Sequence, residues 1–345
     1  MNLKYIRTSF FCVSLLLITV HADTDIVDES NLNRIKSITE IKINEPKKLK
    51  AVDYQIKVNL SEETPSLSTY KVDLINIKKL DSMGKIANIF NFSPEKDKIH
   101  TNRNNSLSRM ITDNTGNTIE YFDSGAIFFS KETMIPEKSE DILHFNGLDK
   151  KSAKTYYSNK ATAFLKRHDL FKNGSYLKNI SFATVQKMSP EDFENLEKGI
   201  KPLTSDAKIV SVAVHFGYKI GDIKTWGAGS ETTLYFDKLG VSGYFNQIRN
   251  FSEIENSKMT ELISSKVAVQ RYTSNKQPKT IFRSSPMVIK NVLIENVELV
   301  YHLKAVNVIQ QKIEPKYLIS GTFIGVDLEG KEVTSKFEWA ESAIK

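Results

Sequence analysis

Apolar residues recur at helical spacing in three stretches of the chain. Residues 83–90 show a short amphipathic pattern, and residues 257–268 show another after a polar cluster. The longest stretch is 152–171, where apolar positions line one face and Asn173-Gly174 follows as a stop signal. The pattern therefore predicts three helices, and the one over 152–171 is the clearest.

Between and after these helices, polar and apolar residues alternate, which is typical of half-buried strands. Turns that contain glycine predict two hairpins, one of residues 118–122 with 126–130 and one of residues 317–326 with 332–339. Residues 219–229, which contain Trp226, are predicted to be a long hairpin connection. Further strands are predicted over 54–58, 70–72, 180–186, 209–218, 231–236, 241–248 and 292–303.

The order of these elements indicates the fold class. Helices do not alternate one for one with strands, so a doubly wound parallel sheet is not expected. We predict an α+β fold of antiparallel sheets, each packed by a helix. The chain is long enough for residues 51–250 to form one or more N-terminal α+β units and for residues 251–345 to form a C-terminal unit.

The N-terminal residues predict the cellular compartment of the protein. Lys4 and Arg7 precede an apolar run over residues 10–20, which is too short for the roughly 20 residues that span a bilayer. Small residues at Val20 and Ala22 suit a signal peptidase. We predict a signal peptide over 1–22, cleaved between Ala22 and Asp23, and a flexible arm over 23–50. The protein is then secreted or periplasmic.

Composition supports a bacterial exported protein. Cys12 is the only cysteine and leaves with the leader, whereas eukaryotic secreted proteins of this size usually carry disulfides. The formal charge is +7, with Lys and Glu interspersed along the chain. Lysines at the helix over 152–171 are interpreted as a solvated face. Export makes nucleic acid an unexpected partner, and no stable membrane span is expected after cleavage.

One region resembles a known group of proteins. Residues 214–222 lead into Trp226-Gly227-Ala228-Gly229-Ser230, and residues 233–237 lead into Gly240-Val241-Ser242-Gly243-Tyr244. This order of a helix, an aromatic strand, a glycine-rich hairpin and a further strand resembles exported bacterial proteins built from PepSY-like units. It is also similar to extracytoplasmic regulators of the YycH and YycI type. Residues 298–301, 314–317 and 330–333 resemble a second, divergent copy.

The resemblance covers residues 52–345 and implies two PepSY-like, cystatin-like units. It also implies the roles found in such proteins, which are inhibitors, folding chaperones and sensor-regulating modules. Their recognition pattern is a topology with turn residues, and it contains no catalytic signature.

Four residues are candidates for binding a partner: Trp226, Gly227, Gly229 and Tyr218. Glycines let a backbone approach a ligand closely, and an exposed tryptophan can anchor an interface. The alternative is structural, with Gly227 and Gly229 supplying positive φ angles while Trp226 caps the core. No P-loop spacing is present, because no helix follows and no lysine is suitably placed.

The sequence contains no catalytic or metal motif, and we expect no cofactor. His215 lies in an apolar strand and is interpreted as a hydrogen-bonded structural histidine. Asp113, Thr115 and Asn117 are interpreted as an ordinary turn, since the spacing of a calcium loop is not met. A triad assembled from distant residues is left open.

Together these observations predict a non-catalytic protein-binding or regulatory module. Its partner would be an extracytoplasmic protein, such as a protease, a sensor ectodomain or a host protein. The first alternative is a secreted effector or toxin that acts on a host or competitor cell. The second is a hydrolase with dispersed catalytic residues.

Overall fold

The computed structural model describes residues 52–79, 83–101, 106–132, 143, 150–185, 208–254, 259–275, 278–280, 287–327 and 330–345. The predicted signal peptide over 1–22, the cleavage point between Ala22 and Asp23 and the arm over 23–50 lie outside these residues. None of the described helices is both long and apolar enough to cross a membrane.

Of the residues that the structure describes, 51% are in strands and 15% in helices, so the fold is mostly β. The predicted α+β fold of two helix-packed units is therefore wrong. α5 (Ser265–Thr273) has nine residues and extends about 14 Å, whereas β18 (Pro315–Val326) has twelve residues and extends about 40 Å. Such a short helix covers only part of its sheet, so the large antiparallel sheets dominate the structure.

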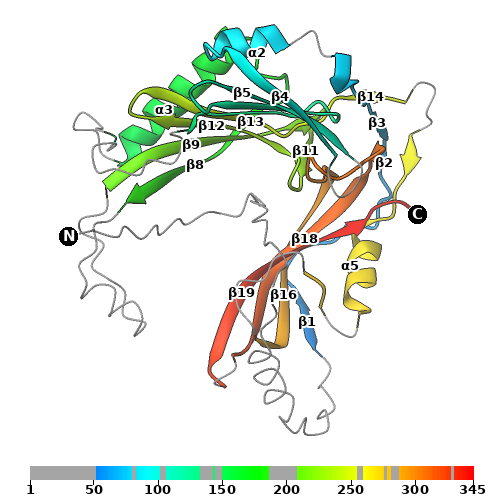
Figure 1. The fold of residues 1–345 in the computed structure, drawn as a ribbon. Helices are drawn as coiled ribbons and strands as arrows, with labels where there is room; N and C mark the ends of the chain where they lie inside the picture. Colours follow the sequence, from blue (N-terminus) through cyan, green and yellow to red (C-terminus); the bar gives the residue numbers. More distant parts are fainter. Residues whose placement is uncertain are drawn as a thin grey trace, which may run out of the picture.

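The larger sheet has eight strands, all antiparallel to their neighbours (Figure 1). The predicted hairpin at residues 118–130 is confirmed as β6 and β7. The first four strands in space are β4 (Pro94–Thr101), β5 (Leu107–Asp113), β6 (Thr118–Phe122) and β7 (Ile127–Ser130). The sheet continues through β13 (Gly240–Asn246), β12 (Glu231–Asp237), β9 (Lys208–Gly217) and β8 (Tyr176–Val185).

Two helices cover one face of this sheet: α2 (Met83–Ile89) and α3 (Lys150–Arg167) (Figure 1). The predicted helix over 152–171 is confirmed by α3, which ends earlier, at Arg167. Its residues Tyr157, Ala161 and Leu165 pack with Val212, Val214 and Phe216 of β9 in one core. Because side chains alternate along a strand, His215 projects from the opposite face of the sheet.

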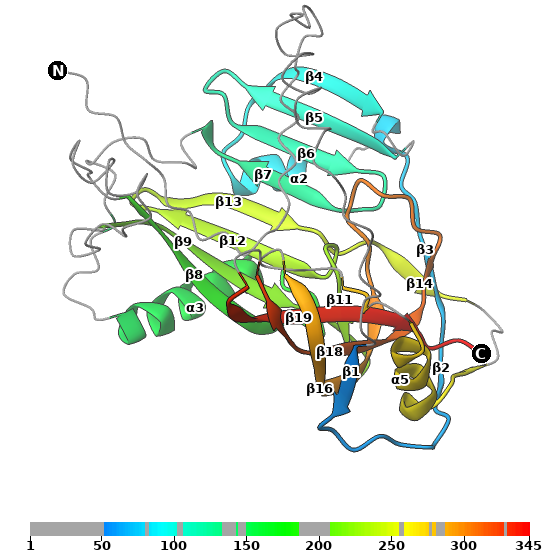
Figure 2. The ribbon, with the colours of Figure 1, turned by 90° about the horizontal axis from the view of Figure 1, so that it is seen from below.

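The second sheet is built around the long strand β16 (Val288–His302). β18 pairs with β16 and with β19 (Glu332–Ser342), which confirms the predicted hairpin over 317–339. Two strands from before residue 250 also pair in parallel with β16 (Figure 2): β1 (Asp53–Ile56) and β11 (Ile223–Trp226). The division of the chain at residue 250 remains a prediction.

Residues 219–229 connect β9 to β12, which pair antiparallel, so the predicted long hairpin connection is confirmed, but it contains two further short strands. β10 (Lys219–Ile220) pairs with β11, and β11 then joins β16 with Thr225 opposite Tyr301 and Trp226 opposite His302. This pairing links residues about 76 positions apart in the chain. A local pattern of turn residues cannot indicate such a partner.

Short strands complete the structure beside these sheets. β3 (Tyr70–Val72) lies between β14 (Phe251–Glu253) and β17 (Lys312–Ile313), and β2 (Ser66–Leu67) pairs with β15 (Thr260–Glu261). A 3₁₀ turn spans Ile77–Lys79. α5 begins at Ser265, later than predicted, because the Ser264 side chain accepts from the Val267 N–H and caps the helix. Val269 and Tyr272 of α5 pack onto Phe337 of β19.

Candidate functional site

The predicted partner-binding residues lie around the C-terminal end of β16. Trp226 is the last residue of β11, and its ring lies 5.4 Å from the His302 ring between centroids. The indole N–H donates to Oε2 of Glu338 on β19 at 3.0 Å. Trp226 is half-buried. It therefore connects three strands of the second sheet.

Gly227 and Gly229 pack directly against the backbone of Leu303 and Lys304. Gly227 has a φ of +107°, and a Cβ at either position would collide with a backbone carbonyl oxygen, that of Leu303 for Gly227 and that of Lys304 for Gly229. The Leu303 N–H donates to the Trp226 carbonyl at 2.8 Å, and the Gly229 N–H donates to the Leu303 carbonyl at 3.1 Å. These glycines therefore let residues 226–229 pack against the segment that follows β16.

Tyr218 lies in an apolar cluster on another side of this segment. It packs with Ile220 and Tyr301, and its ring contacts Phe251 at 6.2 Å between centroids. Burial raises the pKa of the Tyr218 phenol, and the nearby Tyr70 adds to the effect. The structure therefore brings Trp226, Gly227 and Gly229 together at His302–Lys304, whereas Tyr218 packs in the apolar cluster that includes Leu303.

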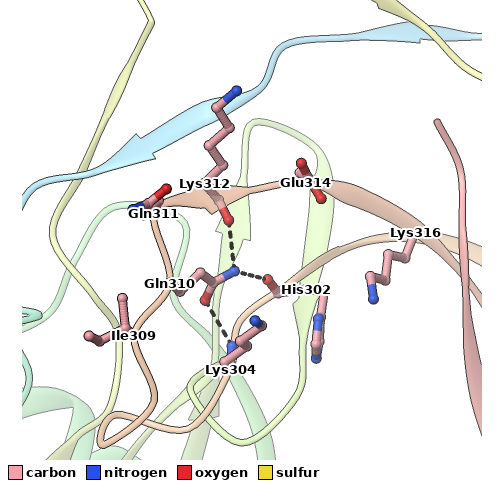
Figure 3. A pocket seen from close by; sticks show the side chains of 8 residues that line it. All are labelled: His302, Lys304, Ile309, Gln310, Gln311, Lys312, Glu314 and Lys316. Carbon is pink, nitrogen blue, oxygen red and sulfur yellow. Dashed lines mark hydrogen bonds between the residues drawn. The ribbon is translucent and has the colours of Figure 1, made fainter. Parts of the chain in front are cut away.

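A polar depression of about 430 Å³ opens beside His302 (Figure 3). The Gln310 side chain shapes it by donating to the carbonyls of His302 at 2.8 Å and Lys312 at 3.0 Å. Its amide oxygen accepts from the Lys304 N–H at 2.9 Å. These bonds hold the loop after β16 in place. The lining consists of His302, Lys304, Ile309, Gln310, Gln311, Lys312, Glu314 and Lys316.

The depression is electrostatically positive. Burial, together with the charges of Lys316 and Lys304, lowers the pKa of His302 to about 4. Lys304, Lys312 and Lys316 form no ion pair with any residue that the structure describes, although lysines such as Lys224 and Lys336 do so elsewhere. Lys312 also lies directly opposite Lys71 on β3. Like charges at opposed positions destabilise a sheet, so this cluster has an energetic cost.

A second polar cluster lies on the face of the eight-stranded sheet opposite α3. His215 Nε2 is 3.0 Å from the Ser181 hydroxyl, and Nδ1 is 3.0 Å from the Thr233 hydroxyl. Nδ1 also lies 3.5 Å from Oε1 of Glu231, whose other oxygen accepts from Lys178 at 3.0 Å. The expected hydrogen-bonded His215 is therefore present, and it contacts a serine and a glutamate from neighbouring strands.

Glu231 in this cluster is strongly acidic. Burial opposes its ionisation, but the hydrogen bond with His215 and the charge of Lys178 outweigh burial and lower the pKa of Glu231 to about 2. The carboxylate is thus ionised at neutral pH and can stabilise a positive charge on His215. Within the described ranges, no group of three or more His, Cys, Asp or Glu side chains could hold a metal ion.

Sequence reasoning missed most members of both clusters. Ser181, His215 and Glu231 come from three strands, and only the register of β8, β9 and β12 brings them together. Lys304, Lys312 and Lys316 come from just after the end of β16, from β17 and from β18, and they line one depression because the loop after β16 folds back. The density of lysines over 304–316 was the one signal available in the sequence.

Comparisons with known proteins identify no family for this chain. No protein-family model and no curated protein matches it. Among solved structures, it is similar to an uncharacterized protein from Eubacterium rectale ATCC 33656, with 11% identity and a TM-score of 0.45. That likeness covers 85% of this chain and 88% of the other. The case for a function therefore rests on this chain's own geometry.

Proposed function

We propose that this protein is an exported, non-catalytic module that captures an extended segment of another protein by strand addition along β19. An edge strand offers a row of backbone donors and acceptors to an incoming peptide, and side-chain pockets then give specificity. The observation that supports the proposal most directly is the length and regularity of this edge. β19 pairs with β18 over eleven residues without a register shift.

The other sheet edges differ from β19 in ways that disfavour strand addition. β4 carries four consecutive charged residues, Glu95 to Lys98, and a bulge. The pairing of β8 with β9 contains two register shifts, β1 has four residues and β10 has two. Bulges, charges and short length are the usual protections of an edge. Among the described strands, β19 is the long edge that no bulge interrupts.

The hydrogen-bond pattern indicates which backbone groups of β19 point outward. The His302 N–H donates to the Glu314 carbonyl at 3.3 Å, so even-numbered residues of β18 bond toward β16 in this antiparallel ladder. Bonding direction alternates along a strand, so odd-numbered residues of β18 bond toward β19. Thr334 lies opposite Ile324. Its N–H and C=O therefore point away from β18, as do those of Lys336 and Glu338.

Thr334→Pro tests the proposal without breaking the β18–β19 ladder. Proline removes one outward N–H and is tolerated at an edge position that faces solvent. Thr334→Ala is the matched control, because it removes the exposed side chain and keeps the N–H. The protein from Asp23 onward would be cross-linked in its native culture, and captured proteins would be identified by mass spectrometry. We expect capture by the wild type and by Thr334→Ala, with loss in Thr334→Pro.

Equal capture by both variants would contradict strand addition at β19. Capture of nothing from its own cell would contradict an endogenous partner, and host or competitor cells would then be tested for the effector alternative. Both variants should retain the thermal unfolding midpoint of the wild type within a few degrees. A large drop in Thr334→Pro would show instead that its N–H is bonded within the fold.

The Ser181–His215–Glu231 cluster favours one second candidate, a hydrolase. In that chemistry Ser181 Oγ attacks an acyl carbon while His215 accepts the hydroxyl proton, and the Glu231 carboxylate stabilises the imidazolium. His215 then gives this proton to the leaving group as its bond to the acyl carbon breaks, and water hydrolyses the acyl-enzyme. A fluorophosphonate probe would label the native protein at Ser181. Labelling should be lost in Ser181→Ala and in the heat-denatured protein but kept in Ser320→Ala. Absence of labelling in the native wild type would contradict the hydrolase.

A further inference from the structure

We propose that the depression beside His302 binds a doubly charged oxyanion, such as sulfate or a phosphate group, between Lys304 and Lys316. The depression joins a concave shape to unpaired positive charge, which is the combination that an anion site requires. This proposal does not depend on strand addition at β19, because it concerns different groups.

The charges in the depression leave a positive excess. Lys304, Lys312 and Lys316 face one carboxylate, Glu314, and His302 is uncharged at neutral pH. None of these lysines has an ion-pair partner among the residues placed in the structure. A doubly charged anion would balance this excess.

The arrangement of the side chains favours one position within the depression. The amino groups of Lys304 and Lys316 lie on either side of the His302 imidazole in Figure 3, whereas Lys312 points away from the ring. The Trp226 ring lies beside that of His302, tilted by 35° and 5.4 Å away between centroids, which limits movement of the imidazole. An oxyanion there would accept hydrogen bonds from two ammonium groups and from one imidazole N–H.

At this position, anion binding should be coupled to the protonation of His302. A bound anion stabilises the imidazolium, so it must raise the pKa of His302 above about 4. Sulfate is the suitable probe, because its own charge does not change over this range of pH. The test measures the pKa of His302 in the full-length purified protein by NMR, with sulfate and with sodium chloride at equal ionic strength. We expect a saturable upward shift with sulfate alone.

Two variants and one control complete the test. Lys304→Gln and Lys316→Gln should each weaken sulfate and phosphate binding about tenfold by calorimetry, since a charged hydrogen bond contributes about 1.5 kcal/mol. Lys290→Gln, an exposed lysine at the other end of β16, should bind as the wild type does. Tighter binding of glycerol 3-phosphate than of inorganic phosphate would show that the group is carried on a larger molecule.

Three results would overturn the proposal. The first is an equal shift of the His302 pKa in sulfate and in chloride. The second is a calorimetric signal that does not saturate, and the third is an equal loss of affinity in Lys290→Gln and Lys316→Gln. All three measurements are made on the isolated protein, so failure of partner capture by β19 leaves their outcome unaffected.

Discussion

At the scale of single residues, Arg249 connects the end of β13 to the loop that follows β16. It follows β13 and is 1% exposed, and its Nη2 donates to the Ala305 carbonyl, to the Val308 carbonyl at 2.7 Å and to the Lys304 carbonyl at 3.2 Å. Burial lowers the pKa of Arg249 to about 10, and the group stays charged at neutral pH. A buried charge is tolerated only when it is hydrogen-bonded, so these carbonyls and the guanidinium stabilise one another.

We expect Arg249→Met to lower the free energy of unfolding by about 3 kcal/mol, because it leaves buried carbonyls without donors. Urea denaturation followed by circular dichroism measures the change. Arg271→Met is the matched control, since Arg271 is exposed and makes one long hydrogen bond of 3.5 Å. Its effect should stay within about 0.5 kcal/mol. Equal losses in the two variants would show that Arg249 does not hold the loop.

Glu231 makes stability depend on pH. Its pKa is about 2 in the folded protein, below the ordinary value of 4.5, so its contribution is fully present above about pH 4.5 and is lost as pH falls toward 2. The shift corresponds to about 3 kcal/mol. Glu231→Gln should therefore be less stable than the wild type at pH 6, and the difference should narrow steadily by pH 2. A constant difference in denaturation across this range would contradict the assignment.

At the scale of elements, the sequence predicted strand pairs whose two strands are close together in the chain. The hairpins β6–β7 and β18–β19 were found because their turns and alternation lie within about twenty residues. β4 was missed because all eight of its residues are exposed and show no alternation. β11 was missed because its partner, β16, is distant in the chain. Trp226, Gly227 and Gly229 were identified as a unit, but His302 and the lysines beside them were not.

A substitution at Gly229 tests how closely residues 226–229 approach the end of β16. Its φ is not positive, so Gly229→Ala adds a collision with the Lys304 carbonyl and no backbone strain. Gly240→Ala is the complement, with φ +117° and open space around the new methyl. We expect a loss above 2 kcal/mol for Gly229→Ala and about 1 kcal/mol for Gly240→Ala in chemical denaturation. A smaller loss at Gly229 than at Gly240 would contradict the close packing.

At the scale of the whole molecule, the prediction of an α+β fold failed because sheet membership is non-local. β7 pairs with β13, and β1 pairs with β16, across more than one hundred residues in each case. Alternation identifies a strand but not its neighbour. The sequence therefore predicted single strands but not the two large sheets into which they assemble. Among the described strands, β19 is the long edge without a register shift, and the proposed function depends on whether that edge is open.

Amide hydrogen exchange tests most directly whether β19 is an open edge to which a partner adds a strand. It is resolved by residue along β19 and measured with and without a captured partner. In the free protein, Thr334, Lys336 and Glu338 should exchange fast, whereas Val333, Phe337 and Trp339 should be protected by β18. The partner should slow exchange at Thr334, Lys336 and Glu338. Slow exchange at those three residues in the free protein, or no change on adding the partner, would contradict strand addition at β19.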